Sequence, residues 1–202
     1  MIKYILFDLG GVVIDFYNED DYYPYISRIS GMREERVARI INYDIRVDLD
    51  RGTVPQKVFE RKMMQQFGIK RKQIQWYEFY TKKATLYRGT LDIISRLHGK
   101  YKVGYLSNTD RSRYTYTVGK LLKPYLKLFD YRFASCDIHL RKPGKEIYRY
   151  ALRRMHAKAG ETVFIDNQIE NVVGANKAGI KSILFTNAKD LEKRLRKMGI
   201  GL

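Results

Sequence analysis

The sequence contains a single cysteine, Cys136, among its 202 residues. One thiol cannot form a disulfide within the chain, which excludes a small domain stabilised by disulfides. The low cysteine content is consistent with a reducing compartment. The chain also lacks any apolar run near the length of about 20 residues that a membrane-spanning helix needs. Residues 1–8 are too short in apolar length and become acidic too early for a signal peptide. We therefore expect a cytoplasmic protein with no membrane partner.

Acidic residues are scarce beside basic ones. The chain has 22 Asp and Glu against 39 Lys and Arg, which gives a formal net charge of +17. Such a surface attracts anions, including phosphorylated metabolites and nucleic acid. The basic residues are spread along the chain without a basic tail, and no nucleic-acid-binding motif accompanies them. We interpret most of them as solvated helix faces and predict no specific nucleic-acid partner.

Short apolar runs alternate with amphipathic stretches, and there is neither an internal repeat nor a low-complexity linker. This alternation predicts an α/β fold with a Rossmann-like parallel sheet. Strands are expected at residues 4–7, 103–106, 131–134, 163–165 and 182–185. The intervening segments carry helical spacing, as at Ile147, Ala151 and Met155.

Residues 16–86 differ from the rest of the chain because they hold no convincing buried strand. Apolar residues recur there at helical spacing, as at Val37 and Ile41 and again at Phe59 and Met63. We predict an all-helical domain at 16–86, inserted into an α/β core formed by residues 1–15 and 87–202. The single tryptophan, Trp76, is expected to pack in a core rather than to bind a ligand.

Polar side chains follow four predicted strands in turn. Ligands of an open parallel sheet gather beyond the carboxyl ends of its strands. The residues at or near those ends are Asp8, Gly10, Gly11, Ser107, Asn108, Lys142, Asp166 and Asn167. Each one alone is an ordinary turn former, helix start or solvated lysine, but their recurrence at successive strand ends favours a shared site.

The residue types in this set suit phosphoryl transfer. A carboxylate such as Asp8 can attack phosphorus and form an acyl-phosphate. The Ser107 hydroxyl, backbone N–H groups and the Lys142 ammonium can hold the anionic oxygens. Mg²⁺ prefers oxygen ligands, which Asp8 and Asp166 can supply. Glycines beside Asp8 let the backbone approach a bound group closely.

Four ordered motifs resemble those of the haloacid dehalogenase-like hydrolases. They are FDLGGVV at residues 7–13, LSNT at 106–109, RKP at 141–143 and FIDN at 164–167, with NVVGANKAG at 171–179. The resemblance covers nearly the whole chain and points to the subgroup with a helical cap inserted after the first motif. It implies that residues 16–86 form this cap, which closes over the substrate.

The resemblance also implies a role for each motif residue. The implied catalytic residues are Asp8 as nucleophile, with Ser107 and Lys142 holding the phosphoryl oxygens. The implied substrate contacts are Gly11, Ser107, Asn108 and Lys142. The implied Mg²⁺ ligands are Asp8, Gly10 through its carbonyl, Asp166 and Asn167. The expected partner is a small phosphorylated metabolite, bound by a monomer or a homodimer.

Two positions depart from the family pattern. Relatives with phosphatase activity usually carry a second Asp, a general acid and base, where this chain has Gly10. General acid–base catalysis contributes about a hundred- to ten-thousand-fold, so a slow enzyme is expected unless Asp15 or a cap residue takes the role. The fourth motif commonly has a second acid where this chain has Asn167, and a neutral amide oxygen should bind Mg²⁺ more weakly.

Two alternatives stay open at this point. The fold could serve as a weakened or non-catalytic binding module, in line with Gly10 and Asn167, although the other motif residues are kept. It could also be a metal-independent 2-haloacid dehalogenase, since those relatives share the missing second Asp and a tyrosine like Tyr148. The Gly-Gly-Val-Val continuation after Asp8 fits that group poorly.

Overall fold

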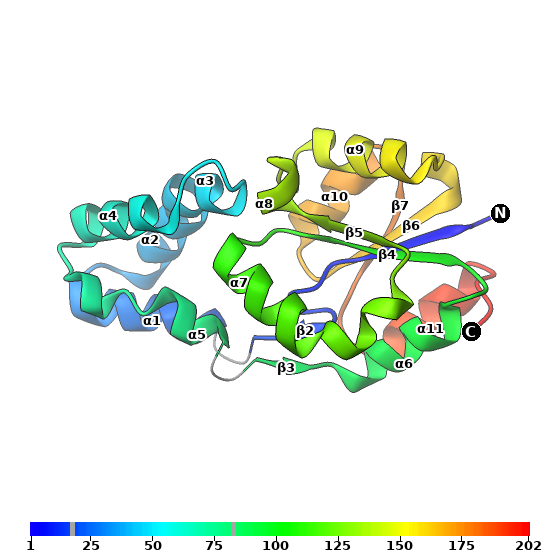
Figure 1. The fold of residues 1–202 in the computed structure, drawn as a ribbon, viewed down its shortest axis with the longest axis horizontal. Coiled ribbons are helices and arrows are strands. Elements are labelled where there is room, and N and C mark those ends of the chain that lie inside the picture. The colour runs from blue at the N-terminus through cyan, green and yellow to red at the C-terminus, as the bar shows by residue number, and fades with distance from the viewer. Residues whose placement is uncertain (17–18, 82–83) are drawn as a thin grey trace.

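The computed structural model of the chain describes residues 1–16, 19–81 and 84–202. Its larger lobe contains a five-stranded parallel sheet in the order β5-β4-β1-β6-β7 (Figure 1). The strands are β1 (Tyr4–Phe7), β4 (Lys102–Ser107), β5 (Tyr131–Ala134), β6 (Thr162–Asp166) and β7 (Lys181–Leu184). All five predicted strands are confirmed to within one residue at each end.

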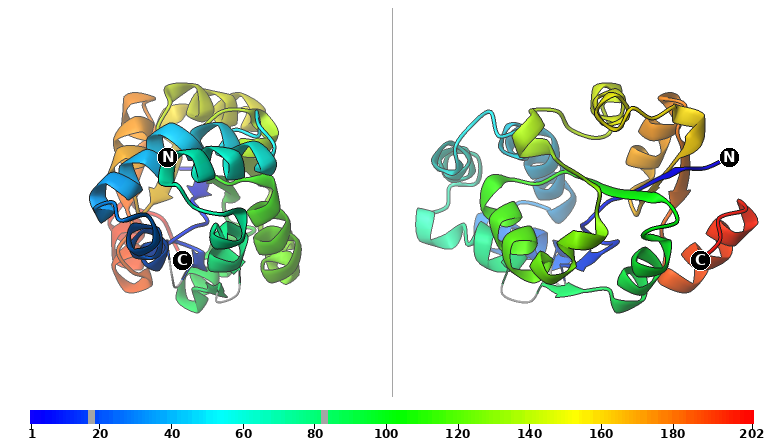
Figure 2. Two further views of the ribbon diagram at one scale, coloured as in Figure 1. Left: turned by 90° about the vertical axis from the view of Figure 1, so that its left-hand side faces the viewer. Right: turned by 45° about the vertical axis from the view of Figure 1, so that its right-hand side comes forward.

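Helices cover both faces of this sheet (Figure 2). The pair α6 (Arg88–Leu97) and α11 (Ala188–Lys197) covers one face, and α9 (Lys145–Met155) and α10 (Ile169–Lys177) cover the other. Successive side chains of β1 enter the two layers alternately: Ile5 and Phe7 pack with α6 and α11, whereas Leu6 packs with α9. This alternation follows from the two-residue period of a strand and explains why β1 is apolar throughout.

The smaller lobe is helical and has its own apolar core. It contains α1 (Glu19–Ser30), α2 (Glu34–Arg39), a π-helical turn (Ile40–Ile45), α3 (Arg46–Asp50), α4 (Gln56–Phe67), a 3₁₀ turn (Arg71–Gln73) and α5 (Trp76–Thr81). The periodic residues Val37, Ile41, Phe59 and Met63 are fully buried in this core. Trp76 is buried with them, as predicted. We refer to this lobe as the cap, and the predicted α/β fold with an inserted helical cap is confirmed.

A two-stranded antiparallel sheet lies where the chain passes between the lobes. It pairs β2 (Ile14–Asp15) with β3 (Thr85–Leu86). The predicted boundary after residue 15 coincides with the end of β2, whereas β3 lies within residues 16–86, for which only helices were expected. Residues 17–18 and 82–83, which belong to the predicted cap, lie outside the described residues.

Between β4 and β5, α7 (Arg111–Tyr116) is followed by a π-helical turn (Thr117–Leu121) and a 3₁₀ turn (Lys123–Leu128); α8 (Ser135–Ile138) follows β5, and a further 3₁₀ turn (Ala159–Glu161) precedes β6. Of these elements, α7 and α8 lie next to the cap (Figure 1). The Asp110 carboxylate caps α7 by accepting a bond from the backbone N–H of Arg113 at 2.9 Å. α7 contacts α5 of the cap.

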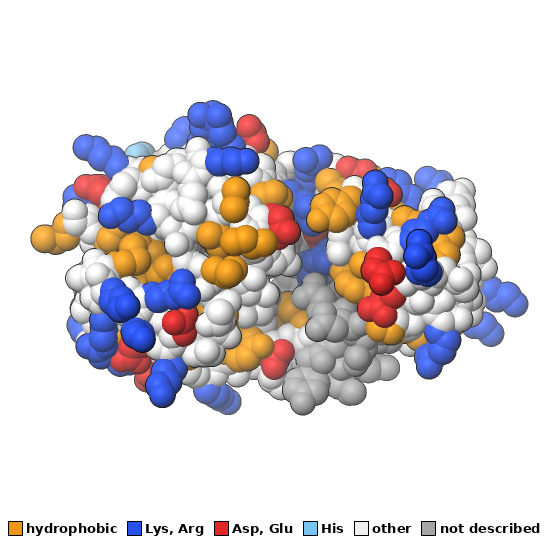
Figure 3. Space-filling view, turned by 180° about the vertical axis from the view of Figure 1, so that it is seen from behind, with side chains coloured by type: hydrophobic (Ala, Val, Ile, Leu, Met, Phe, Trp, Pro, Cys, Tyr) orange, Lys and Arg blue, Asp and Glu red, His pale blue; other side chains and the backbone are white. Residues whose placement is uncertain are grey.

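Basic side chains are scattered over both lobes on the face drawn in Figure 3, without one dominant basic patch. In the described parts of the chain, no helix is both long enough and apolar enough to cross a membrane.

Candidate active site

The predicted site residues meet at the carboxyl edge of the sheet, under the cap. A cavity of about 440 Å³ lies there. Its core-side lining includes the predicted residues Asp8, Gly10, Ser107, Asn108, Lys142 and Asn167. The cap contributes Tyr23, Asn42, Tyr43 and Arg46. Of the predicted residues, Asp166 and Gly11 do not line the cavity.

Lys142 lies between two carboxylates. Its Nζ is 2.9 Å from Oδ1 of Asp8 and 2.6 Å from Oδ2 of Asp166. All three residues are buried, and Asp166 is fully so. A lysine rarely enters an interior unless it is paired, and here one ammonium serves two carboxylates. The trio therefore carries a net charge of −1 when all three groups are ionised.

Burial and neighbouring charges set the ionisation of this trio. Burial raises the pKa of Asp8 to about 7, with Asp166 adding to the rise and Lys142 opposing it. Burial alone would lower the pKa of Lys142, but Asp166 and Asp8 more than offset this, so that its pKa lies above the ordinary lysine value. Lys142 is therefore a stable ammonium group beside the candidate nucleophile.

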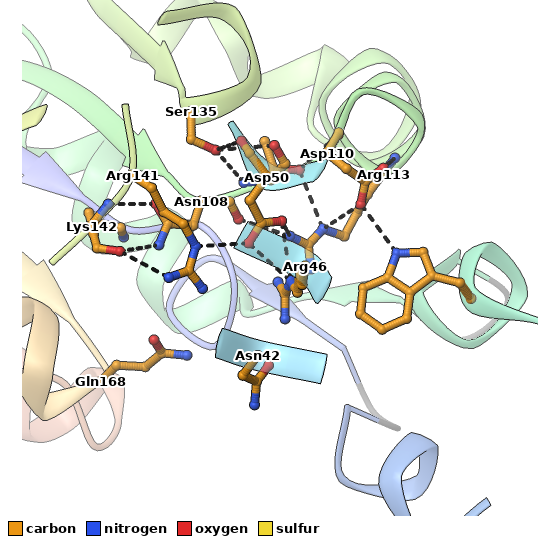
Figure 4. Close-up of polar contacts among 12 residues, drawn as sticks. Asn42, Arg46, Asp50, Asn108, Asp110, Arg113, Ser135, Arg141, Lys142 and Gln168 are labelled. Carbon is orange, nitrogen blue, oxygen red and sulfur yellow. Dashed lines mark hydrogen bonds and ion pairs between the residues drawn. The ribbon is translucent and has the colours of Figure 1, made fainter. Parts of the chain in front are cut away.

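Asn108 clamps the main chain of Lys142 (Figure 4). The Asn108 Oδ1 accepts a bond from the Lys142 backbone N–H at 2.9 Å, and its Nδ2 donates to the Lys142 carbonyl at 3.0 Å. We call this pair of bonds the Asn108–Lys142 clamp. These bonds indicate that Asn108 holds the backbone of Lys142 in position, a role that the sequence analysis missed. A direct contact between Asn108 and substrate stays a prediction.

Asn171 orients the Asp166 carboxylate. Its Nδ2 lies 3.2 Å from Oδ1 and 3.0 Å from Oδ2 of Asp166, and the Gln168 backbone N–H donates to Oδ1 at 2.8 Å. The Asn171 carbonyl accepts a bond from the Tyr148 hydroxyl at 2.7 Å. The sequence analysis gave Asn171 no role. The available signal was its position in the first turn of the helix that follows Asp166.

Gly11 has a left-handed backbone conformation, with φ of +73°, which favours glycine. A Cβ there would lie only 2.2 Å from Nδ2 of Asn167, which is the end of an exposed side chain that can move aside. The Gly11 N–H donates to the Ile14 carbonyl at 2.8 Å, so the donor that a phosphoryl oxygen would use already has a partner. The backbone conformation thus explains Gly11, and its contact with substrate stays a prediction.

Cys136 is buried. Burial raises the pKa of its thiol to about 11. The thiolate, which is the nucleophilic form, is therefore scarce at neutral pH.

The donor set around Lys142 fits a hard cation in its chemistry. Within the described ranges, no three His, Cys, Asp or Glu side chains gather around one point. Mg²⁺ does not need such a cluster, because it keeps several waters and often uses one or two carboxylates with substrate phosphate. Asp8 and Asp166 offer two carboxylates, and the Gly10 carbonyl and the Asn167 amide offer neutral oxygens.

The sequence-family model of the haloacid dehalogenase-like hydrolases matches residues 2–179 of this sequence. The chain belongs to this family. The family to which the four motifs pointed is thereby confirmed, whereas the subgroup suggested by the FDLGGVV motif stays a prediction. Among curated relatives, D-ribitol-5-phosphate phosphatase of Bacteroides thetaiotaomicron is 24% identical over 96% of this chain and 97% of its own length.

Other relatives match only in part. A sesquiterpene phosphatase of Aspergillus oryzae is 35% identical over 35% of this chain, and the match spans 36% of that protein. Drimenol cyclase of Aspergillus calidoustus is 29% identical over 48% of this chain, but the match spans only 18% of the cyclase. This chain thus covers well under two thirds of either fungal protein.

Several solved structures of other proteins share the fold of this chain. A haloacid dehalogenase family enzyme of Bacteroides thetaiotaomicron superposes with a TM-score of 0.78 at 23% identity, over 96% of this chain and 98% of that one. The same enzyme, in complex with magnesium and inorganic phosphate, gives 0.72 at 23% identity over 93% and 96% of the chains. An L-2-haloacid dehalogenase of Xanthobacter autotrophicus gives 0.62 at 17% identity over 100% and 85%.

Proposed function

We propose that this hydrolase is a Mg²⁺-dependent phosphatase that acts on a small polar phosphomonoester through an aspartyl-phosphate on Asp8. The observation that carries the proposal is the Lys142 ammonium, buried and 2.9 Å from Oδ1 of Asp8 at the floor of a cavity. A fixed cation beside a carboxylate is what an anionic transferred group requires, because two anions must otherwise meet without compensation.

Asp8 would act first as the nucleophile. Its carboxylate oxygen forms a bond to phosphorus while the bond from phosphorus to the leaving oxygen breaks, and the leaving oxygen takes up a proton from solvent water, since Gly10 offers no acid. Lys142 and the Ser107 hydroxyl hold the equatorial oxygens during this transfer. Water then attacks phosphorus and gives up a proton to solvent, the bond to Asp8 breaks, and inorganic phosphate leaves with the carboxylate restored.

Asp8, Asp166, the Gly10 carbonyl and Asn167 would hold the Mg²⁺. When bound, the ion supplies positive charge between the nucleophile and the phosphoryl oxygens. The net charge of −1 that Asp8, Lys142 and Asp166 carry when Asp8 is ionised favours a divalent cation there. The complex of magnesium and phosphate with an enzyme of the same fold supports this assignment.

The cap residues that line the cavity favour a polar substrate. The Tyr23 hydroxyl donates to Oδ1 of Asn42 at 2.9 Å, so an amide and a phenol face the cavity together. A leaving group with hydroxyls, such as a polyol, can bond to both. The relative that acts on D-ribitol-5-phosphate supports this substrate class.

The direct test is phosphate release from p-nitrophenyl phosphate by wild type and Asp8→Asn, with Mg²⁺ and with chelator. We expect Asp8→Asn to abolish turnover and chelation to suppress it in the wild type. The control is Asp92→Asn, because Asp92 lies on α6 with its side chain two-thirds exposed. Equal rates for wild type and Asp8→Asn would reject the nucleophile assignment.

The same measurement separates the two alternatives. Halide release from a 2-haloacid in chelator, without phosphate release under any metal, would favour dehalogenation. Absence of turnover across a panel of phosphomonoesters would favour a binding module.

A further inference from the structure

A buried carboxylate of the cap contacts three arginines at the boundary between the lobes (Figure 4). Asp50, the last residue of α3, is fully buried. Its carboxylate lies 3.1 Å from Nε of Arg46 in the cap, 3.5 Å from Nη2 of Arg113 in α7 and 3.2 Å from Nε of Arg141. Burial would raise the pKa of Asp50, but the three guanidinium groups hold it below the ordinary aspartate value. Asp50 is therefore an ionised group that joins the cap to the core.

The turn after Asp50 fits the backbone of the core. The Ser135 hydroxyl donates to the Asp50 carbonyl, and Nδ1 of His139 lies 2.8 Å from the Arg51 carbonyl oxygen. Gly52 has a φ of +65°, and a Cβ there would lie 2.4 Å from the carbonyl oxygen of Cys136. Only glycine allows the backbone at residue 52 to approach the backbone at residue 136 so closely. Residues 50–52 thus dock against residues 135–141; we call this contact the cap dock.

The cap dock reaches the Asn108–Lys142 clamp from two sides. Arg141, which contacts Asp50, is joined to Lys142 by one peptide bond. Arg113, which also contacts Asp50, donates from Nη2 to the Asn108 carbonyl at 2.9 Å. The two arginines therefore connect Asp50 to both partners of the clamp.

We propose that Asp50 is a positioning residue, which with Gly52 holds the Asn108–Lys142 clamp in its working place when the cap is docked. Removal of the dock shifts the Lys142 ammonium relative to Asp8. A displacement of about 1 Å in an active site can cost roughly a hundredfold in rate. The cap thereby contributes to the chemical step through the core as well as by lining the cavity.

The experiment compares two glycine variants of the cap, Gly52→Ala and Gly68→Ala. The two positions share the same backbone conformation, with φ of +65° and +64°, but nothing lies within 4 Å of a Cβ at Gly68. The first readout is hydrogen–deuterium exchange of peptides that cover residues 135–144, where the Lys142 N–H is held by Asn108. The second is kcat and KM for p-nitrophenyl phosphate with Mg²⁺. The first readout does not depend on the proposed function, whereas the second does.

We expect Gly52→Ala to exchange faster at residues 135–144 and to lose about ten- to a hundredfold in kcat. Its KM for this small substrate should change little, whereas Gly68→Ala should match wild type in both readouts. Asp50→Asn, which keeps the side-chain shape, should behave like Gly52→Ala. Its control is Asp48→Asn, since Asp48 lies on the same helix and pairs with Lys62 at the surface.

Two results would overturn the proposal. One is unchanged exchange at residues 135–144 in Gly52→Ala, which would mean that the dock does not hold the clamp. The other is faster exchange with unchanged kcat, which would mean that the clamp does not position Lys142 for catalysis. If wild type hydrolyses no phosphomonoester, the proposed function fails, but the exchange comparison still decides whether the dock holds the clamp.

Discussion

Replacement of Lys142 by methionine removes one charge from the centre of the site while nearly keeping the volume of the side chain. The Nζ of Lys142 lies within 3 Å of both Asp8 and Asp166, and its side chain is fully buried. In the variant, the two carboxylates would face each other with no cation between them.

The expected cost follows from this geometry. Lys142 lowers the pKa of Asp8, which is about 7 in its presence, so without the ammonium one carboxylate takes up a proton at neutral pH and the other stays buried without a cation. Loss of one partner from a buried ion pair typically costs about 3–5 kcal/mol, because a buried charge is left uncompensated. We therefore expect the free energy of unfolding of Lys142→Met to fall by about 3 kcal/mol in chelator at neutral pH. Loss of a preorganised donor to the transition state should lower kcat by about a hundred- to a thousandfold.

The assay combines thermal or denaturant unfolding with phosphate release from p-nitrophenyl phosphate. The matched control is Lys145→Met, because Lys145 is exposed at the start of α9 only three residues away. The control should match wild type in stability and rate. A Lys142→Met protein as stable as wild type would refute the charge argument. A rate within about tenfold of wild type would refute the assignment of Lys142 to the phosphoryl oxygens.

Three further outcomes are expected. Asn167→Asp should lower the Mg²⁺ concentration that half-saturates phosphate release, since a charged oxygen binds a hard cation better than an amide does; an unchanged or higher value would mean that Asn167 does not face the metal. Gly11→Ala should lower the unfolding free energy by roughly the 1–2 kcal/mol of left-handed backbone strain, as should Gly31→Ala with φ of +72° and open space around it, because the Asn167 side chain that a Cβ at Gly11 would meet is exposed and can turn away; a markedly larger loss for Gly11→Ala in thermal unfolding would contradict this. Binding of non-specific DNA to the basic surface should fade steeply as salt is raised, and sequence-selective binding at physiological salt, measured by competition, would contradict the prediction of no specific nucleic-acid partner.

The prediction of the sheet succeeded because its signal is local. An apolar run such as residues 4–7 is typical of a strand that is covered on both faces, so the run itself predicts that the strand is buried. The convergence of Asp8, Ser107 and Asp166 was also predictable. Parallel strands end at one edge, and a residue that follows such a strand must lie at that edge.

The partners of the site residues were not predictable in the same way. Asn108 and Lys142 are 34 residues apart, and their two bonds depend on how two loops meet above the sheet. An Asn after a strand has the same local appearance whether its amide holds a substrate or a backbone. The sequence analysis therefore placed Asn108 at the site without the role that its bonds indicate.

The sequence by itself determined the α/β class, the inserted helical cap and the chemistry gathered at the strand ends, because periodicity and residue type decide these locally. Only the tertiary structure decided which charges share a partner. In the sequence, Asp50 is an acidic residue before a turn with a glycine, and nothing near it indicates a partner. Arg141, which contacts it, is 91 residues away in the sequence. Their contact exists because the cap folds back on the core and excludes water, and inside that contact a carboxylate is stable only beside the guanidinium groups that surround it.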